Sequence, residues 1–397
     1  PMTANIDSLF ITPILTYDAF HILLTLTQTA DFVDVAMTPN QIAAAGGARS
    51  LGGGPVYLAI AALGDVGEVR AAFDAISGEI GASAQTALLD DSRFPREAAL
   101  DRLRVALGGV GADSGTQIED RISGNLALWG QGFGALSRWS SDGNAAAMDR
   151  TIGGFLMGGD ALIAENLRLR VMGGYSLSRF SVDDRASAGM ADTYTLGAYG
   201  GGEWDAFTLK GGLAHSWHSL DTSRSMAFSG FSDDLSASYG ARTLQAWGEA
   251  AYSFEAGAVR LEPFANLAYV NLSTDGFTET GGLAALNATS SVADAAFTTI
   301  GLRAETDATL GDFDAKLRGM VGWRHAFGDT PTSQMRFASG SDAFTIAGMP
   351  LSRDALVLDA GIDLSLTDNA TLGFAYGGQF GSGGRDHSAT LNFNVQF

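Results

Sequence analysis

The chain has 397 residues, 46 % of them hydrophobic, with 52 Gly, 8 Pro, no Cys and a formal net charge of −20. The acidic balance disfavours nucleic-acid binding because phosphates would be repelled, and the lack of Cys excludes disulfides, thiolate catalysis and zinc–cysteine sites. No segment of about 18 residues is both uncharged and strongly apolar, so a spanning helix is not expected and membrane residence would require a barrel.

Residues 1–30 are predicted to be extended. The run from Ile14 to Leu26 is rich in Ile, Leu, Thr and Tyr with polar residues between them, a composition typical of strands. We interpret this segment as the C-terminal end of a larger β-structure upstream. Between Pro1 and Asp7 there is no basic stretch followed by an apolar core, so we predict no secretory signal there and interpret the chain as a C-terminal fragment or a processed form.

Residues 31–121 change to an Ala-rich composition with helical periodicity. Helices are predicted at Pro55–Leu63, Glu68–Ile76, Glu79–Leu89 and Pro95–Leu107. The last of these regions has a basic bias within an acidic protein, which fits a solvated helix face as well as it fits a binding role. The basic residues are Arg93, Arg96, Arg102 and Arg104. Residues 108–121 are rich in Gly and are predicted to form a flexible linker.

From residue 122 onwards, apolar and polar residues alternate almost continuously, with the period of two that a strand with one oily and one wet face produces. About twelve segments have the ~10 residues that a strand needs to cross a bilayer, and an even number suits a closed bacterial barrel. A soluble β-sandwich also alternates, but the long, hairpin-like succession favours an all-β transmembrane barrel. The predicted strands are residues 122–139, 149–163, 166–182, 190–206, 207–224, 236–254, 257–273, 294–310, 312–327, 352–367, 369–381 and 385–397.

Several predicted strands have one apolar face and one face that carries charges. In residues 312–327, for example, Leu317, Val321 and Trp323 alternate with Arg318 and Arg324. A basic side chain that faces lipid near the bilayer midplane costs about 2–4 kcal/mol, so these charges are expected to face a polar lumen. The predicted lumen-facing charges are Arg168, Arg170, Glu249, Arg260, Glu262, Arg303, Glu305, Lys316, Arg318 and Arg324.

No catalytic, cofactor-binding or metal site is predicted. His215 and His218 are an odd number of residues apart, which places their imidazoles on opposite faces of a strand. Asp183 and Asp184 alone are too few ligands for Ca²⁺ and are better explained as a solvated turn. No helix is predicted after Gly130–Gly134, which argues against a phosphate-binding loop. The chain is therefore not expected to be an enzyme.

Three segments together resemble a known family. Thr38–Gln41, Ser83–Leu103 and Leu128–Gly134 are similar to the start of the helical linker, the segment before the barrel and the first barrel strand of the monomeric autotransporters (type Va secretion). Residues 389–397 alternate strictly between apolar and polar, and this pattern resembles the signal that the outer-membrane barrel-assembly machinery reads. The signal residues would be Leu391, Phe393, Val395 and Phe397. The resemblance covers roughly residues 10–397.

The resemblance implies a monomeric barrel of about twelve strands in a Gram-negative outer membrane, in contact with lipid and lipopolysaccharide. Residues 31–121 would be the helical linker and a pore helix that threads the lumen. Residues 122–397 would be the translocator barrel, which anchors and helps translocate an N-terminal passenger to the cell surface, and residues 1–30 would be the passenger's end. The alternative is a porin-like diffusion channel, against which the helical segment ahead of the barrel argues.

The resemblance also raises two questions about the pore helix. Several relatives are cleaved there beside paired Asn, but this chain has no Asn between Asn40 and Asn125, so we predict an uncleaved or differently processed passenger. We further expect the arginines of Pro95–Leu107 to meet inward acids of the barrel and so to help seal the pore, each pair contributing about 1 kcal/mol. The acids considered are Glu249, Glu262 and Glu305.

Overall fold

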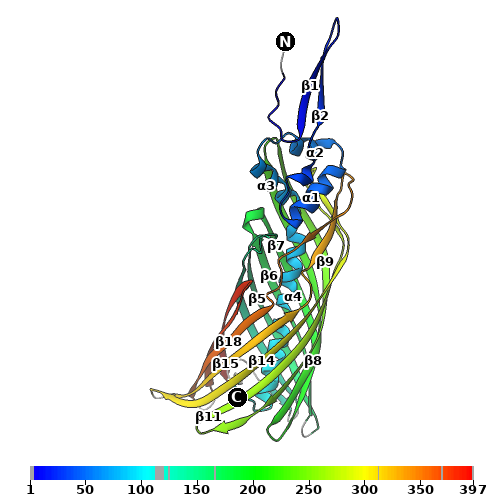
Figure 1. Cartoon of the computed structure of the whole chain (residues 1–397). Helices are drawn as coiled ribbons and strands as arrows, with labels where there is room; N and C mark the ends of the chain where they lie inside the picture. Colours follow the sequence, from blue (N-terminus) through cyan, green and yellow to red (C-terminus); the bar gives the residue numbers. More distant parts are fainter. Residues whose placement is uncertain are drawn as a thin grey trace.

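The computed structural model describes residues 4–111, 120–123, 126–164, 167–311, 313–367 and 370–395. They form a closed β-barrel with helices inside it, a cap of helices and loop strands at one end, and a hairpin that projects from the cap (Figure 1). We refer to the cap end, at the top of Figure 1, as the upper end.

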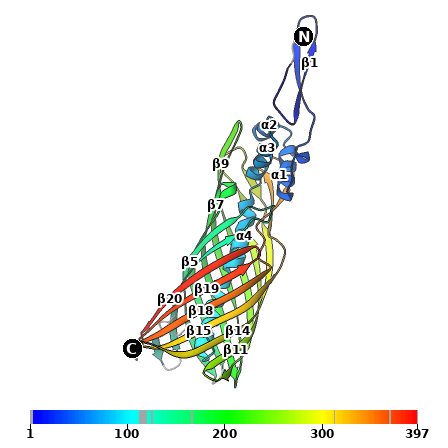
Figure 2. The ribbon, with the colours of Figure 1, turned by 60° about the vertical axis from the view of Figure 1, so that its left-hand side comes forward.

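The projecting hairpin consists of β1 (Ile11–Tyr17) and β2 (Ile22–Gln28), which pair antiparallel. Asp18 closes the turn, because its Oδ1 accepts the backbone N–H groups of Phe20 and His21, each at 2.7 Å. The hairpin points away from the remainder of the chain (Figure 2), and every residue of β2 is exposed.

Three helices, α1 (Pro39–Ser50), α2 (Gly54–Ala61) and α3 (Val66–Ile76), follow the short η1 (Phe32–Asp34). Thr38 begins α1 with a capping box: its hydroxyl accepts the N–H of Gln41 at 3.2 Å, and the Gln41 side chain accepts the N–H of Thr38 at 3.3 Å. These reciprocal bonds satisfy backbone donors that a helix start otherwise leaves free.

The three helices pack on a small sheet made by two upper loops of the barrel. Its strands are β12 (Phe277–Thr278), β13 (Leu286–Ala288), β16 (Thr332–Phe337) and β17 (Phe344–Ala347). Buried apolar residues of the helices and of this sheet form one continuous core. At Gly47 of α1 a side chain would meet the ring of Phe344 at 2.3 Å, so glycine permits this close approach. We call α1–α3 together with the sheet the cap.

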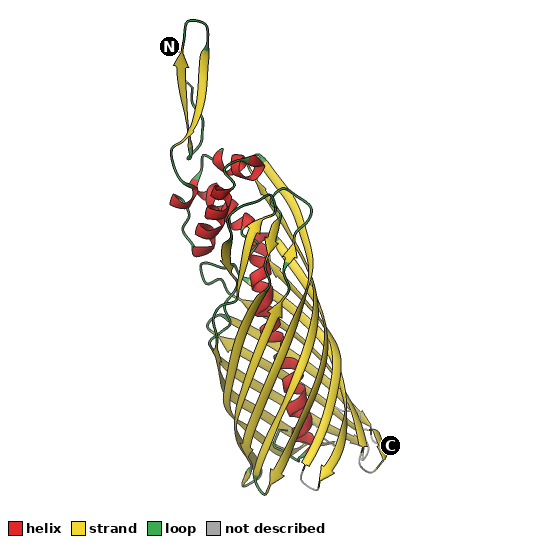
Figure 3. Cartoon of the chain, turned by 90° about the vertical axis from the view of Figure 1, so that its right-hand side faces the viewer, coloured by secondary structure: helices red, strands yellow, loops and turns green. Residues whose placement is uncertain are grey.

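Two further helices, α4 (Glu79–Asp91) and α5 (Arg93–Ala106), run from the cap down through the interior of the barrel (Figure 3). All but the last residue of α4 are buried. α4 ends where the Ser92 hydroxyl donates to the carbonyl of Leu89 at 2.7 Å. Apolar residues of both helices pack against inward side chains of the wall, among them Trp129, Leu156 and Tyr199.

Twelve strands of the described chain close the barrel, each antiparallel to its neighbours. Closure comes from the pairing of β20 with β4 and of β9 with β11. The short β3 (Asp120–Ser123) and β10 (Phe254–Ala256) pair with β4 and β11, and η2 (Asp183–Arg185) lies between β6 and β7. The wall strands are β4 (Leu126–Trp139), β5 (Met148–Ala164), β6 (Leu167–Val182), β7 (Ser187–Trp204), β8 (Phe207–Phe228), β9 (Phe231–Tyr252), β11 (Val259–Thr274), β14 (Ser291–Leu310), β15 (Phe313–Phe327), β18 (Asp354–Thr367), β19 (Ala370–Gly381) and β20 (Gly384–Val395).

Successive wall residues point alternately into and out of the barrel. On β7, Tyr194 and Leu196 are 62 % and 60 % exposed, whereas Thr193 and Thr195, which alternate with them, are buried. Large apolar side chains thus cover the outside and polar ones line the inside, the reverse of a soluble barrel. The predicted barrel of about twelve antiparallel strands is confirmed, and the β-sandwich alternative is wrong. None of the helices in the described ranges has both the length and the hydropathy to span a membrane.

Candidate functional site

The junction between α4 and α5 lies in a network of buried charges. Arg150 of β5 contacts the carboxylate of Asp90 at 3.2 Å and also that of Asp91. Asp386 of β20 forms an ion pair with Arg93 at 2.7 Å and accepts a hydrogen bond from Arg150 at 3.2 Å. The end of one helix and the start of the next are therefore bound to strands on both sides of β4, where the barrel closes.

A second network lies on the wall beside α5. Arg303 of β14 donates to both oxygens of Glu249, at 2.9 and 2.8 Å, and to Glu262 at 2.8 Å. Lys210 of β8 donates to Glu249 at 3.2 Å, and the Arg303 guanidinium lies 3.7 Å from the ring centroid of Phe264. All four charged residues are at most 5 % exposed. Two cations therefore face two anions with little water, a geometry in which removal of one member is costly.

The chain that leaves α5 is bound to the wall through its backbone. The N–H of Val110 donates to Glu262 at 3.3 Å, and the N–H of Gly111 donates to Glu305 at 2.8 Å. Arg260 donates to the carbonyl of Gly108 at 2.9 Å. Higher in the lumen, the same kind of contact recurs where Arg170 of β6 donates to the carbonyl of Arg102 at 3.0 Å.

The pore-helix arginines have other partners than the sequence suggested. The expected pairing with Glu249, Glu262 and Glu305 is wrong for Arg96, and Arg93, which precedes Pro95, is not part of that expectation. Arg93 forms an ion pair with Asp386, and Arg96 donates a hydrogen bond to Gln245 at 3.0 Å. Arg104 forms an ion pair with Asp101 of the same helix.

The register of the wall explains this difference. Glu249 lies directly opposite Lys210, and Glu262 lies directly opposite Arg303 on the neighbouring strand. Cross-strand pairs have Cβ atoms about 5 Å apart. The acids are therefore paired with cations of the wall itself, and no side chain of the pore helix is needed to pair with them.

Most of the charges predicted for the lumen are placed in the interior. Arg260 and Lys316 are less enclosed, with side chains 41 % and 38 % exposed. The side chain of Arg168 lies outside the described part of the structure. The buried members are Arg170, Glu249, Glu262, Arg303, Glu305, Arg318 and Arg324.

The sequence analysis missed five members of the two networks, among them Asp91 beside Asp90. Lys210, Arg150 and Asp386 occupy alternate positions of their strands, on the inward face, so the period-two pattern could have identified them. Asp90 gave no such signal, because it lies in a helix that is buried on nearly all sides and so has no distinct polar face.

Comparison with known proteins identifies the family. Residues 128–377 match the family model described as Autotransporter beta-domain. The chain belongs to the autotransporter family. Two curated relatives, both described as extracellular serine protease from Serratia marcescens, are 35 % and 33 % identical over 352 and 351 residues, which is 88 % of this chain. The chain spans 33 % of the length of each of these relatives.

The barrel also resembles a solved autotransporter structure. The translocator domain of autotransporter NalP from Neisseria meningitidis superposes with a TM-score of 0.60, at 17 % identity, over 80 % of this chain and 99 % of that one. The chain is thus an outer-membrane translocator domain of a Gram-negative bacterium, and the porin alternative is not favoured. Autotransporter barrels have short periplasmic turns and longer extracellular loops, so the upper end is extracellular.

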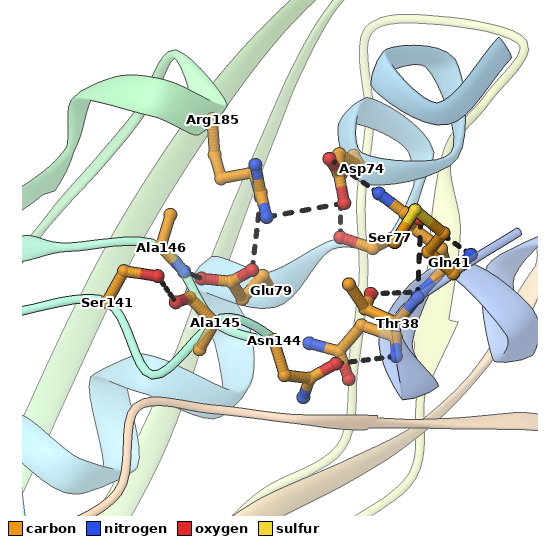
Figure 4. Close-up of polar contacts among 12 residues, drawn as sticks. Thr38, Gln41, Asp74, Ser77, Glu79, Ser141, Asn144, Ala145, Ala146 and Arg185 are labelled. Atoms are coloured by element: carbon orange, nitrogen blue, oxygen red, sulfur yellow. Dashed lines mark hydrogen bonds and ion pairs between the residues drawn. The ribbon is translucent and has the colours of Figure 1, made fainter. Parts of the chain in front are cut away.

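In this autotransporter the cap is joined to the barrel by a polar contact at the extracellular mouth (Figure 4). Glu79, the first residue of α4, accepts the N–H of Ala146 at 2.8 Å and the Arg185 guanidinium at 3.1 Å. Arg185, in the loop between β6 and β7, also contacts Asp74 of α3 at 3.3 Å. Asp74 in turn accepts from Gln41 of α1 at 3.1 Å. One arginine thereby connects the barrel to two helices.

A second arginine joins the cap to the long β8 strand. Arg224 donates to both oxygens of Glu279, at 2.7 and 2.6 Å, and to the carbonyl of Ala75 in α3 at 2.8 Å. Its side chain is 3 % exposed. The planar guanidinium satisfies a carboxylate and a helix carbonyl together, which a lysine could not do with the same geometry.

The cap is expected to bind the barrel more tightly as the pH falls. Burial raises the pKa of Glu79 and of Asp74, and the charge of Arg185 opposes this only in part. A carboxyl with a raised pKa in the docked state binds its proton more strongly there, so docking gains stability as the pH falls through the raised value and loses it as the pH rises. Hydrogen exchange of the α1–α3 amides at pH 7 and pH 5, corrected for intrinsic rates, measures this. The D74N/E79Q double variant should remove the difference; if it persists there, other groups cause it.

Replacing Arg185 with Met is expected to loosen the cap without unfolding the barrel. Two largely buried carboxylates, Glu79 and Asp74, would lose their cation, at a cost of about 1–3 kcal/mol. Limited proteolysis of residues 4–77 on the folded protein would report the change. Arg49→Met is the matched control, because Arg49 forms an exposed pair with Asp31 at 2.7 Å. Equal protease resistance of both variants would contradict a role for Arg185.

Proposed function

We propose that this translocator domain exports an N-terminal passenger, keeps it attached to the cell surface, and is closed afterwards by α4 and α5. The path of the chain supports the proposal. The hairpin and the cap lie outside the extracellular mouth, whereas α4 and α5 occupy the lumen and lead to backbone contacts at Val110 and Gly111 further down. A chain can take this path only if the part that precedes α4 has crossed the barrel.

The first experiment places an epitope tag before Pro1, behind a signal peptide, in a Gram-negative host. Protease is then added to intact cells. We expect the tag to be removed while the barrel stays protected, because the N-terminal side of the chain would be outside. A tag that is cut only after the outer membrane is permeabilised would place the cap in the periplasm and overturn the proposal.

We further propose that the passenger is a serine protease and that this domain itself is not catalytic. The two relatives described as extracellular serine proteases support the first part. The test expresses the complete gene product and measures casein hydrolysis by intact cells and medium, with and without a serine-directed fluorophosphonate. Inhibitor-insensitive activity would overturn the first part, and activity of residues 1–397 alone would overturn the second.

The C-terminal strand is proposed to be the signal for the barrel-assembly machinery, acting on a monomer. β20 extends to Val395, pairs with β19 along its length and pairs with β4 over residues 384–388, where the barrel closes. The side chains of Leu391, Phe393 and Val395 lie outside the described part of the structure, as does Phe397. Deleting Phe397 is expected to reduce the heat-modifiable barrel in outer membranes, whereas Gln396→Ala should not. Normal assembly without Phe397 would contradict this role.

A further inference from the structure

The outside of the barrel carries an aromatic row that marks the outer lipid boundary. Phe155, Tyr175, Tyr194 and Trp217 lie directly opposite one another across β5, β6, β7 and β8. The first two pairs of rings are in contact, with centroids 6.4 Å apart for Phe155 and Tyr175 and 5.3 Å apart for Tyr175 and Tyr194. Amphipathic rings of this kind concentrate where hydrocarbon meets headgroups.

The same level is marked around the rest of the wall by aromatic groups that bond diagonally to the next strand. Tyr269 donates to Asp294 at 2.7 Å, and Trp323 donates to Asp354 at 3.0 Å. The Tyr376 hydroxyl lies 2.8 Å from Nδ1 of His387. In each case the partner is on the adjacent strand. It lies two residues before the residue that pairs directly with the aromatic one.

Below the aromatic row, the outer face of β6–β8 is apolar. Val171, Leu196 and Leu213 are 60 %, 60 % and 56 % exposed. Above the row, towards the cell exterior, the outer face becomes polar within four residues along β5, β6 and β8. Thr151, Arg179, Asp221 and Ser238 share one register row with Met190 of β7, and Asp149 and Ser223 share the next with Ala188 of β7.

These two rows line a hollow of about 720 Å³ on β5–β9. Arg179 is exposed at its edge and makes no ion pair within the described part of the chain. The hydroxyls of Thr151 and Ser223 and the carboxylates of Asp149 and Asp221 lie around the same hollow. A cation, hydroxyls and hydrogen-bond acceptors are thus grouped directly above an aromatic row and an apolar wall.

We propose that this hollow binds the phosphorylated sugar headgroup of an outer-leaflet glycolipid, lipopolysaccharide, whose acyl chains lie along β6–β8. The Arg179 guanidinium matches a phosphate in shape and charge. The carboxylates accept hydrogen bonds from sugar hydroxyls or amides, and the aromatic row contacts the boundary between sugar and acyl chain. A free phosphate would use only Arg179, whereas an anchored glycolipid also uses the apolar wall below.

The test measures binding of bisphosphorylated lipid A to the detergent-purified chain by native mass spectrometry. We expect Arg179→Glu to weaken binding by roughly tenfold or more, since one charge-assisted contact is replaced by repulsion. Arg353→Glu is the matched control, because Arg353 is exposed and lies outside the hollow. Heat modifiability on gels shows whether each variant is folded, and Arg179→Gln serves if the glutamate variant is not.

Three results would overturn the proposal. Equal binding to the wild type and the Arg179 variants would exclude this residue. Equal binding of lipid A from which both phosphates have been removed would exclude phosphate recognition. Displacement of lipid A by millimolar inorganic phosphate would show a free-anion site rather than a glycolipid site.

Discussion

Replacing Arg303 with Met is expected to lower the free energy of unfolding of the barrel by about 3–5 kcal/mol. Arg303 is bonded to Glu249 and Glu262 in the interior, and its removal would leave two buried carboxylates against Lys210 alone. An uncompensated buried charge is costly because it keeps its desolvation penalty while it loses its partner. Urea unfolding of the refolded barrel in micelles, followed by tryptophan fluorescence, measures the change.

Arg260→Met is the matched control for this prediction. Arg260 is paired with Glu305 at 2.7 Å, but its side chain is 41 % exposed, so water replaces much of what is lost. The expected change is under about 1 kcal/mol. If Arg303→Met lowers the free energy of unfolding by no more than Arg260→Met does, the Glu249–Arg303 network contributes little to stability.

Removing residues 4–107 is expected to convert a nearly closed barrel into an open aqueous channel. Both lumen helices and the cap would be lost, so polar wall residues would meet water instead of Leu88, Leu100 and Leu103. Single-channel recordings in planar bilayers should show low conductance for the full chain and sustained openings for the truncated one. Water-filled lumens of this kind conduct ions in porins.

The control for this prediction removes only residues 13–26 of the hairpin and keeps Phe10, which is buried in the core of the cap. The hairpin lies outside the cap, so its loss should leave the conductance as low as in the full chain. Both proteins must first show heat-modifiable migration, which reports a closed barrel. A truncated barrel that stays closed would mean that the wall itself collapses, and open channels in the control would mean that the helices do not seal the lumen.

The barrel could be predicted because membrane strands obey a simple rule. Every lipid-facing position must be apolar and every second position faces a wet lumen, so segments such as residues 313–327 reveal both their extent and their inward charges. The predicted boundaries lie within a few residues for most strands. The largest differences are at the extracellular ends of β8 and β9, where strands continue to Phe228 and from Phe231. There the outer face is no longer in lipid, so its residues need not be apolar and the alternation no longer marks the extent of the strand.

The cap and the charge pairing could not be predicted in the same way. β16 and β17 are short, and they form because the cap helices cover them. The ring of Phe344 in β17, for example, packs against Gly47 of α1. The partner of an inward acid depends on strand register, which the composition of one strand does not reveal. Glu262 lies in the interior, and its cation is Arg303 on the adjacent strand rather than an arginine of the pore helix.

The contacts between the wall and the lumen segment have a consequence for evolution. Arg170, Glu262 and Glu305 all contact main-chain atoms of the lumen segment. Every residue type has these atoms, except that proline lacks the N–H. Substitutions at Arg102, and at Val110 by any residue but proline, therefore leave these bonds available, whereas Gly111 has a φ of 69° that favours glycine. The barrel and the segment inside it can diverge at separate rates, and the same wall can accept many unrelated linkers, provided that they are about as long and as narrow as this one.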